Sequence, residues 1–136
     1  MKYPLRVVSL DRSLFEGDVE FMIATGAEGE LGVLARHAPL MTILKPGPLR
    51  IQETYGGPDQ VLFVGGGFLE VLPERVTVLA DVAEHADEIS VEAAEEARRR
   101  AQERLKGTLS AAEETEFQNA LAMAEARLRL ARARRR

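Results

Sequence analysis

Glycine and proline are confined to one part of the chain, and this division constrains the fold more than any other feature. All six prolines and ten of the eleven glycines precede residue 76, and only Gly107 follows. Both residue types interrupt helices, because glycine is conformationally permissive and proline lacks a backbone N–H. The sequence therefore predicts a turn-rich first part, residues 1–86, and a continuous helical second part, residues 87–136.

Short apolar segments in the first part are typical of β-strands. Predicted strands cover residues 5–10, 19–25, 49–54, 60–65, 68–72 and 75–81. They are rich in Val, Ile, Leu and Phe, and turn-forming stretches such as Pro46-Gly47-Pro48 separate them. Because no helical period lies between them, the first part is predicted to be an antiparallel β-sandwich or barrel.

The second part is predicted to be an antiparallel hairpin of two helices, which makes the fold class α+β. Ser90 can cap a helix over about 91–105, and Ser110 and Glu113 have the spacing of a capping box for a second helix. The apolar stripes are Ala94, Ala97, Ala101 and Leu105 in the first helix, and Phe117, Ala120/Leu121, Ala124, Leu128 and Ala131 in the second. Each alanine buries little apolar area, and buried apolar area contributes about 25 cal/mol per Å² to stability. We therefore expect a hairpin that is marginal alone and able to dock, undock or extend.

Charge is distributed unevenly along the chain. Residues 1–86 carry 7 basic and 12 acidic residues, a balance of −5, whereas residues 87–136 carry 11 and 10, a balance of +1. No acidic residue follows Glu125, and the basic end consists of Arg127, Arg129, Arg132, Arg134, Arg135 and Arg136. Two interpretations stay open, a solvated helix end that complements the helix dipole and a docking site for an acidic protein surface.

The side chains that enzymes and metal sites use are too few or too dispersed to form a catalytic set. The chain has no cysteine, its two histidines, His37 and His85, lie in different segments, and no paired metal-ligand spacing occurs. The three glycines before Phe68 do not complete the Gly-x-Gly-x-x-Gly spacing of a phosphate-binding loop, because Glu70 stands at its last position, and no helix follows. A bulge or a close approach between sheets is therefore the favoured interpretation. We expect no catalytic residue, no metal site and no cofactor.

Nucleic-acid binding and membrane insertion are not expected either. The net charge is −4 and no aromatic residue lies near the arginine cluster, so that end lacks the stacking platform of single-strand binders. The N-terminus has the features of neither a signal peptide nor a transit segment. Apolar runs stay far below the ~20 residues that span a bilayer, and we expect a soluble chain.

Several motifs occur in an order that resembles one family over nearly the whole chain. They are Gly-Glu-Leu-Gly at 29–32, His-Ala-Pro-Leu at 37–40, Lys-Pro-Gly at 45–47, Gly-Gly-Phe at 66–68 and Val-Leu-Ala-Asp at 78–81. Followed by two helices, this order is similar to the epsilon subunit of bacterial F-type ATP synthases, the counterpart of the mitochondrial delta subunit. The resemblance implies an N-terminal β-sandwich and a C-terminal helical hairpin, in agreement with the division drawn from glycine, proline and periodicity.

The resemblance implies a non-catalytic rotor subunit of the proton-translocating synthase. In that family the sandwich binds the gamma subunit and contacts the membrane c-ring, at the cytoplasmic face of the membrane and peripheral to it. The hairpin can extend along gamma and block the alpha/beta subunits, which inhibits ATP hydrolysis. For this sequence the resemblance places Glu30, Leu31 and His37 near the c-ring. His37 is also expected to be a turn histidine that bonds backbone, and a rigid turn suits an interface loop.

The sequence departs from the family where some members bind ATP. Their first helix opens with Ile/Leu-Asp-x-x-Arg-Ala, whereas this chain has Ser90 and Ala93 at the Asp and Arg positions. Alanine offers no guanidinium to a phosphate, and the neighbouring Glu92 would repel one. Although arginines 98–100 lie near, we expect no strong ATP sensing.

The basic end gives the hairpin a specific expected role. If this subunit inhibits hydrolysis, we expect the extended second helix to dock its arginines on acidic loops of the alpha/beta subunits. The arginines concerned are Arg127, Arg129, Arg132 and Arg134. A small free-standing enzyme and a nucleic-acid adaptor stay as alternatives. Turnover by the isolated chain would support the first, and salt-sensitive nucleic-acid binding the second.

Overall fold

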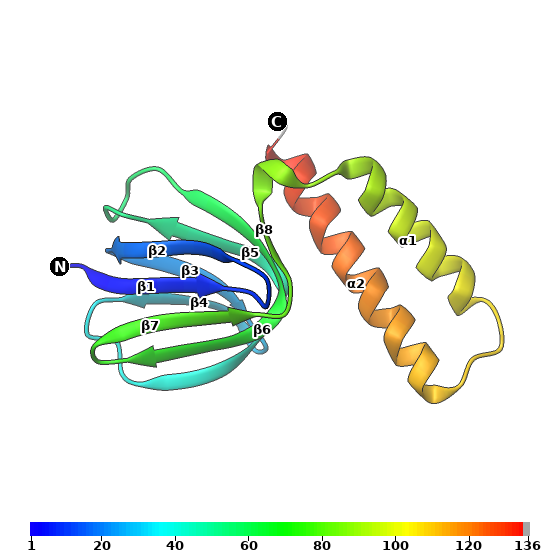
Figure 1. The fold of residues 1–136 in the computed structure, drawn as a ribbon, viewed down its shortest axis with the longest axis horizontal. Coiled ribbons are helices and arrows are strands. Elements are labelled where there is room, and N and C mark those ends of the chain that lie inside the picture. Colours follow the sequence, from blue (N-terminus) through cyan, green and yellow to red (C-terminus); the bar gives the residue numbers. More distant parts are fainter. Residues whose placement is uncertain (135–136) are drawn as a thin grey trace. The chain divides into compact units, whose positions relative to one another are not determined.

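The computed structural model describes residues 1–134, and Arg135 and Arg136 of the predicted basic end lie outside the described residues. The chain divides after His85 into two compact units, one over Met1–His85 and one from Ala86 onward. The first unit is built from strands and the second from helices (Figure 1). The predicted α+β class, with a β-sandwich before two helices, is confirmed.

The elements follow one another along the chain without mixing of strands and helices. The strands are β1 (Tyr3–Val8), β2 (Ser13–Val19), β3 (Phe21–Gly26), β4 (Gly29–Leu34), β5 (Leu40–Gln52), β6 (Gln60–Leu72), β7 (Arg75–Ala80) and β8 (Ala83–His85). The second unit contains a 3-10 turn, η1 (Ala86–Glu88), and two α-helices, α1 (Val91–Leu105) and α2 (Ala111–Arg134). Helix α1 has the bounds that the sequence predicts.

Two long central strands organise the sandwich. The strands pair in the order β2-β1-β7-β6-β5-β3-β4, with β8 beside β6, and only the β1–β7 pair is parallel among the described strands. β5 and β6 have 13 residues each and pair from Leu40↔Val71 to Ile51↔Gln60. One end of this pair borders β7, and the other borders β3 and β8. β5 and β6 therefore run through both layers of the sandwich, the one that contains β7 and the one that contains β3 and β8.

The predicted strands differ from the observed ones where glycine and proline occur. The sequence does not predict β2 and β4, which contain glycines and lie at the ends of the strand order. Pro46-Gly47-Pro48, predicted as a turn, lies inside β5. That prediction is wrong because the β3–β5 register shifts between Ile23 and Gly26, and prolines are tolerated at such irregularities. The predicted strands 60–65 and 68–72 form the single strand β6.

The glycines inside β6 allow a close approach of two backbones. Gly66 and Gly67 have φ values of +98° and +134°, a region that side chains disfavour. A Cβ on Gly67 would lie 2.1 Å from the carbonyl oxygen of Leu79 on β7. The Gly65 amide donates to the Val82 carbonyl over 2.7 Å. The glycine run thus serves strand packing, as favoured from the sequence.

The core of the sandwich is filled by aliphatic side chains from both layers. Leu5, Met22, Leu62 and Leu69 are at most 1% exposed and belong to one cluster of buried residues. Tyr3 also lies in this core, and its hydroxyl donates to the Val33 carbonyl over 2.7 Å, joining β1 to β4. Burial raises the pKa of Tyr3, so its hydroxyl stays a donor. This bond gives the Val33 carbonyl of β4, a strand at the end of the strand order, a hydrogen-bond donor.

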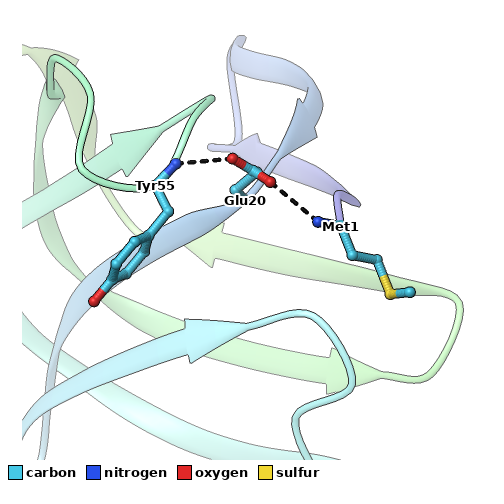
Figure 2. A network of polar contacts seen from close by, with 3 residues as sticks. All are labelled: Met1, Glu20 and Tyr55. Carbon is cyan, nitrogen blue, oxygen red and sulfur yellow. Dashed lines mark hydrogen bonds and ion pairs between the residues drawn. The ribbon is translucent and has the colours of Figure 1, made fainter.

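A carboxylate ties the N-terminus to a distant loop of the sandwich. Glu20, between β2 and β3, accepts from the α-amino group of Met1 and from the Tyr55 amide, both over 3.0 Å (Figure 2). The Tyr55 ring contacts Phe21 edge to face, with centroids 5.1 Å apart. The bond from the Tyr55 amide, followed by the one from the N-terminus, lowers the pKa of Glu20. The ionised form of Glu20 is therefore the one that holds these segments together.

Local capping interactions define the ends of both helices. The Ser90 Oγ accepts from the Ala93 amide over 3.1 Å at the start of α1. Ser110 and Glu113 form a reciprocal capping box at the start of α2, with two bonds of 3.2 Å. These bonds satisfy N–H groups that lack a partner within the helix. Both predicted caps are confirmed.

The hairpin interior is rich in alanine, as the sequence predicts. Ala94 and Ala101 are the buried residues of α1. Those of α2 are Ala124, Ala126, Leu128, Leu130 and Ala131. The predicted stripe of α2 is only partly correct, because Ala120 is exposed and Phe117 and Leu121 are half-buried. Arg104 of α1 covers the Phe117 ring, with 4.5 Å between Cζ and the ring centroid, which replaces an apolar contact by a cation–π contact.

Candidate interaction surfaces

An apolar row crosses four strands on the outer face of one layer. The pairing registers place Val8 beside Leu79, Leu79 beside Phe68, and Phe68 beside Ile43. Leu79, Phe68 and Ile43 are 51%, 48% and 58% exposed. Adjacent strands lie about 4.8 Å apart, so these four residues, the apolar row, form a continuous strip. Contiguous exposed apolar surface of this kind marks interaction sites.

A second row on the same face is mainly charged and borders the apolar row. The registers place Arg6 beside both Glu16 and Thr77, and Thr77 beside Glu70. Met41, which is 65% exposed, pairs with Glu70 at the end of this row. The face thus combines an apolar centre with a polar margin, which is the arrangement of protein–protein interfaces.

The residues that the resemblance places near the c-ring are separated by the length of β4. Glu30 and Leu31 lie at the start of β4, where Glu30 is exposed and Leu31 is half-buried against the core. His37 follows the other end of the strand. Leu34, at the end of the strand, is four residues beyond Glu30, or about 13 Å away at 3.3 Å per residue. A surface that includes all three residues must run along the whole strand.

His37 has the backbone bonds expected of a turn histidine. Its amide donates to the Leu34 carbonyl over 3.2 Å, and its Nδ1 lies 2.7 Å from the Ala38 carbonyl oxygen. The preceding Arg36 has a φ of +67°, so the chain turns sharply between Leu34 and His37. These contacts fix the imidazole on the surface beside β4.

The arginines of α2 differ in their partners. Arg132 contacts Glu95 of α1 over 3.1 Å, and Arg134 contacts Asp87 of η1 over 2.5 Å. Arg129 is exposed, and within residues 1–134 it forms no ion pair. The predicted basic end is therefore partly engaged inside the second unit.

The structure also shows what the departure from the ATP-binding motif does locally. The hydroxyl of Ser90 is bonded to the Ala93 amide, and the exposed Ala93 side chain carries no polar group.

No group of three or more His, Asp or Glu side chains suited to a metal ion occurs in the described part of the chain. Neither described helix combines the length and apolar character of a membrane span.

Comparison with known proteins identifies the family. The family described as "ATP synthase, Delta/Epsilon chain, beta-sandwich domain" matches residues 2–86, which is the whole sandwich. The chain belongs to this family. The ATP synthase epsilon chain of Chromohalobacter salexigens is 46% identical over 123 residues, covering 90% of this chain and 86% of that protein. The epsilon chain of Pelotomaculum thermopropionicum is 54% identical over 101 residues, covering 74% of each.

Solved structures support the same relationship. A chain in the mitochondrial ATP synthase of Euglena gracilis, solved as OSCP/F1/c-ring, superposes with a TM-score of 0.78 at 25% identity, over 92% of this chain and 78% of that chain. A chain of the Tetrahymena thermophila mitochondrial ATP synthase central stalk and c-ring has a TM-score of 0.66 at 15% identity, over 96% and 97% of the two chains, and shows the shared fold. The relatives are epsilon chains, non-catalytic subunits of the synthase, in agreement with the expectation of a subunit that is not itself an enzyme.

Sequence reasoning missed the apolar row. The signal was present in segments 43–44, 68–69 and 78–80, where apolar residues occupy neighbouring positions instead of alternating with polar ones. A strand with one solvent face should alternate. Loss of that alternation indicates either burial on both faces or an exposed apolar strip, and only the registers decide between the two.

Proposed function

We propose that the chain is a central-stalk, or rotor, subunit of a proton-translocating F-type ATP synthase that couples the gamma subunit to the c-ring. The apolar row carries this proposal, because a subunit that transmits torque needs a surface that a partner covers permanently. The relatives are epsilon chains of ATP synthase. The subunit would be peripheral to the cell membrane, at its cytoplasmic face, and would meet the membrane only through the complex.

Gamma is the proposed partner of the apolar row. The row and its charged margin combine apolar area with polar side chains that can fix orientation. The test is binding of purified gamma to F68S/L79S, with the equally exposed Leu34→Ser as the matched control in β4, away from this face. We expect about a 30-fold or larger loss of affinity for the double variant, as for hot-spot residues, and none for the control. Equal binding by both variants would exclude the apolar row as the gamma surface.

The c-ring is the proposed partner of the β4 side of the sandwich. Glu30, Leu31 and His37 lie along that strand, so the contact would extend over its whole length. Single cysteines at positions 30 and 37 of this cysteine-free chain should both crosslink to c-ring loops in the assembled complex. Crosslinking from only one end would restrict the contact to that end.

The hairpin is the proposed inhibitory part. Arg127, Arg129, Arg132 and Arg134 would bind acidic loops of the alpha/beta subunits when the helices extend. A chain truncated after Ala86 should keep gamma binding and lose inhibition of ATP hydrolysis by the reconstituted complex. Changing the four arginines to Gln should weaken inhibition, and added salt should do the same to the wild type because screening acts over about 8 to 10 Å. Equal inhibition by both proteins at every salt concentration would favour apolar contacts instead.

The proposed inhibition does not depend on strong ATP binding by the hairpin. Ser90 caps α1 and Ala93 lacks a charge, so we expect neither to hold a nucleotide. Calorimetric titration of the isolated chain with ATP should show no micromolar binding.

A further inference from the structure

Two ion pairs connect the end of α2 to the beginning of the second unit. Arg132 bonds Glu95, 37 residues away in sequence, over 3.1 Å, and Arg134 bonds Asp87, 47 residues away, over 2.5 Å. Both lie at the end of the hairpin opposite its turn, because Glu95 is near the start of α1 and Asp87 precedes that helix. Contacts at this end join the parts of the two helices that would move farthest apart if the hairpin opened at its turn.

Helix α1 contributes little apolar area to the hairpin. The buried side chains of α1 are both alanines, and each methyl contributes far less burial than a leucine or phenylalanine side chain. The turn end is held separately, by the capping box and by Arg104, which lies 3.6 Å from Glu113 and covers Phe117. At the open end, the two distant ion pairs act together with the buried Leu128 and Leu130 of α2.

We propose that Arg132–Glu95 and Arg134–Asp87 form a clasp that holds the hairpin closed and must open before these arginines can bind an acidic partner. The release of the arginines to a partner rests on the proposed inhibitory function, whereas the clasp is a property of the isolated chain. Closed and extended forms compete for the same guanidinium groups. Conditions that weaken the clasp would therefore make the arginines available.

The exposure of the four side chains makes the clasp sensitive to salt. Their exposed fractions are 51% and 48% for Arg132 and Glu95, and 40% and 79% for Arg134 and Asp87. Exposed pairs are screened over a Debye length of about 3 Å at 1 M salt. Two exposed pairs together change an equilibrium by about two- to 30-fold.

Spin labels on the full-length chain can measure opening directly. Because the chain contains no cysteine, Ala93→Cys and Ala122→Cys, both at exposed positions of the two helices, provide unique attachment sites. In this background D87N/E95Q removes both acidic partners and keeps every arginine. The matched control is E92Q/E116Q, which removes the same number of negative charges at exposed glutamates of α1 and α2.

We expect D87N/E95Q to raise the open-to-closed ratio about two- to 30-fold at low salt, with no change in the control. The wild type should open to the same extent at 1 M salt, and D87N/E95Q should respond little to salt. Glu95→Arg should open the hairpin, and E95R/R132E should close it again by restoring a pair of opposite charge, with helicity checked by circular dichroism. Equal distance distributions in D87N/E95Q and its control, or a wild type unaffected by salt, would overturn the clasp. Because no other subunit is present, this result is independent of whether the chain inhibits hydrolysis.

Discussion

The two units of this protein are stabilised by different interactions. In the sandwich, large aliphatic residues such as Leu62 and Leu69 are fully buried, and strands distant in sequence, such as β1 and β7, lie side by side. In the hairpin, alanines fill much of the interface, and caps and ion pairs supply the specific contacts. One chain thus combines a unit held by large buried aliphatic side chains with a unit in which alanines, helix caps and exposed ion pairs make many of the contacts.

A backbone contact in the sandwich gives the sharpest test of this contrast. Gly67→Ala should destabilise the sandwich by about 2 to 6 kcal/mol, the combined cost of a strained positive φ and of overpacking, because its Cβ would lie 2.1 Å from the Leu79 carbonyl oxygen. Gly56→Ala is the control, since its φ of +83° is also positive but nothing lies within 4 Å of the added Cβ. Urea denaturation measures both. Similar losses for the two variants would show that backbone strain alone, without the close approach, sets the cost.

Core burial in the sandwich should give the next largest effect. Leu69→Ala removes a side chain that is 0% exposed and should lower the free energy of unfolding by about 2 to 5 kcal/mol. Leu79→Ala on the neighbouring strand, where the side chain is 51% exposed, should change it by about 0.5 kcal/mol or less. Denaturation monitored by sandwich and helix signals separately would show which unit is affected. A comparable loss for Leu79→Ala would mean that the apolar row is part of the core.

Capping should matter in the hairpin and leave the sandwich unchanged. Ser90→Ala and Ser110→Ala each remove an acceptor for a helix N–H and should each cost about 0.5 to 2 kcal/mol of helix stability. Thermal melts followed by the helical circular dichroism signal would detect the loss. Thr108→Ala, in the connection between the helices, is the control. Destabilisation of the sandwich by either Ser variant would contradict the separation of the two units.

The smallest predicted effect is the pH dependence of one surface network. The Tyr55 amide and the N-terminus lower the pKa of Glu20 from 4.5, so its stabilising contribution is complete above that pH and disappears as the pH falls below it. Glu20→Gln should therefore be less stable than the wild type at pH 7, and the two proteins should converge in acid. Acetylation of the N-terminal amine should have part of the same effect at pH 7. A difference that stays constant from pH 7 to acid would show that ionisation of Glu20 is not involved.

The helical unit was largely predictable because its determinants are local. Helix α1 depends on a cap at Ser90 and on alanines at helical spacing, and the capping box of α2 is contained within four consecutive residues. The ion pairs of Arg132 and Arg134 could not be predicted. They join residues 37 and 47 positions apart, and several acidic residues stand at comparable distances in the sequence.

The sequence by itself determined the division into two units, the helices and their caps, and the motif order that indicates the family. These properties arise from the backbone preferences of neighbouring residues, and from residue types that can be read in order. Only the tertiary structure decided that Pro46 and Pro48 lie within a strand, that β5 and β6 pass through both layers, and that Ile43, Phe68 and Leu79 form one exposed strip. Each of these depends on the register between strands, and a register is set by the packing of distant side chains rather than by local preference.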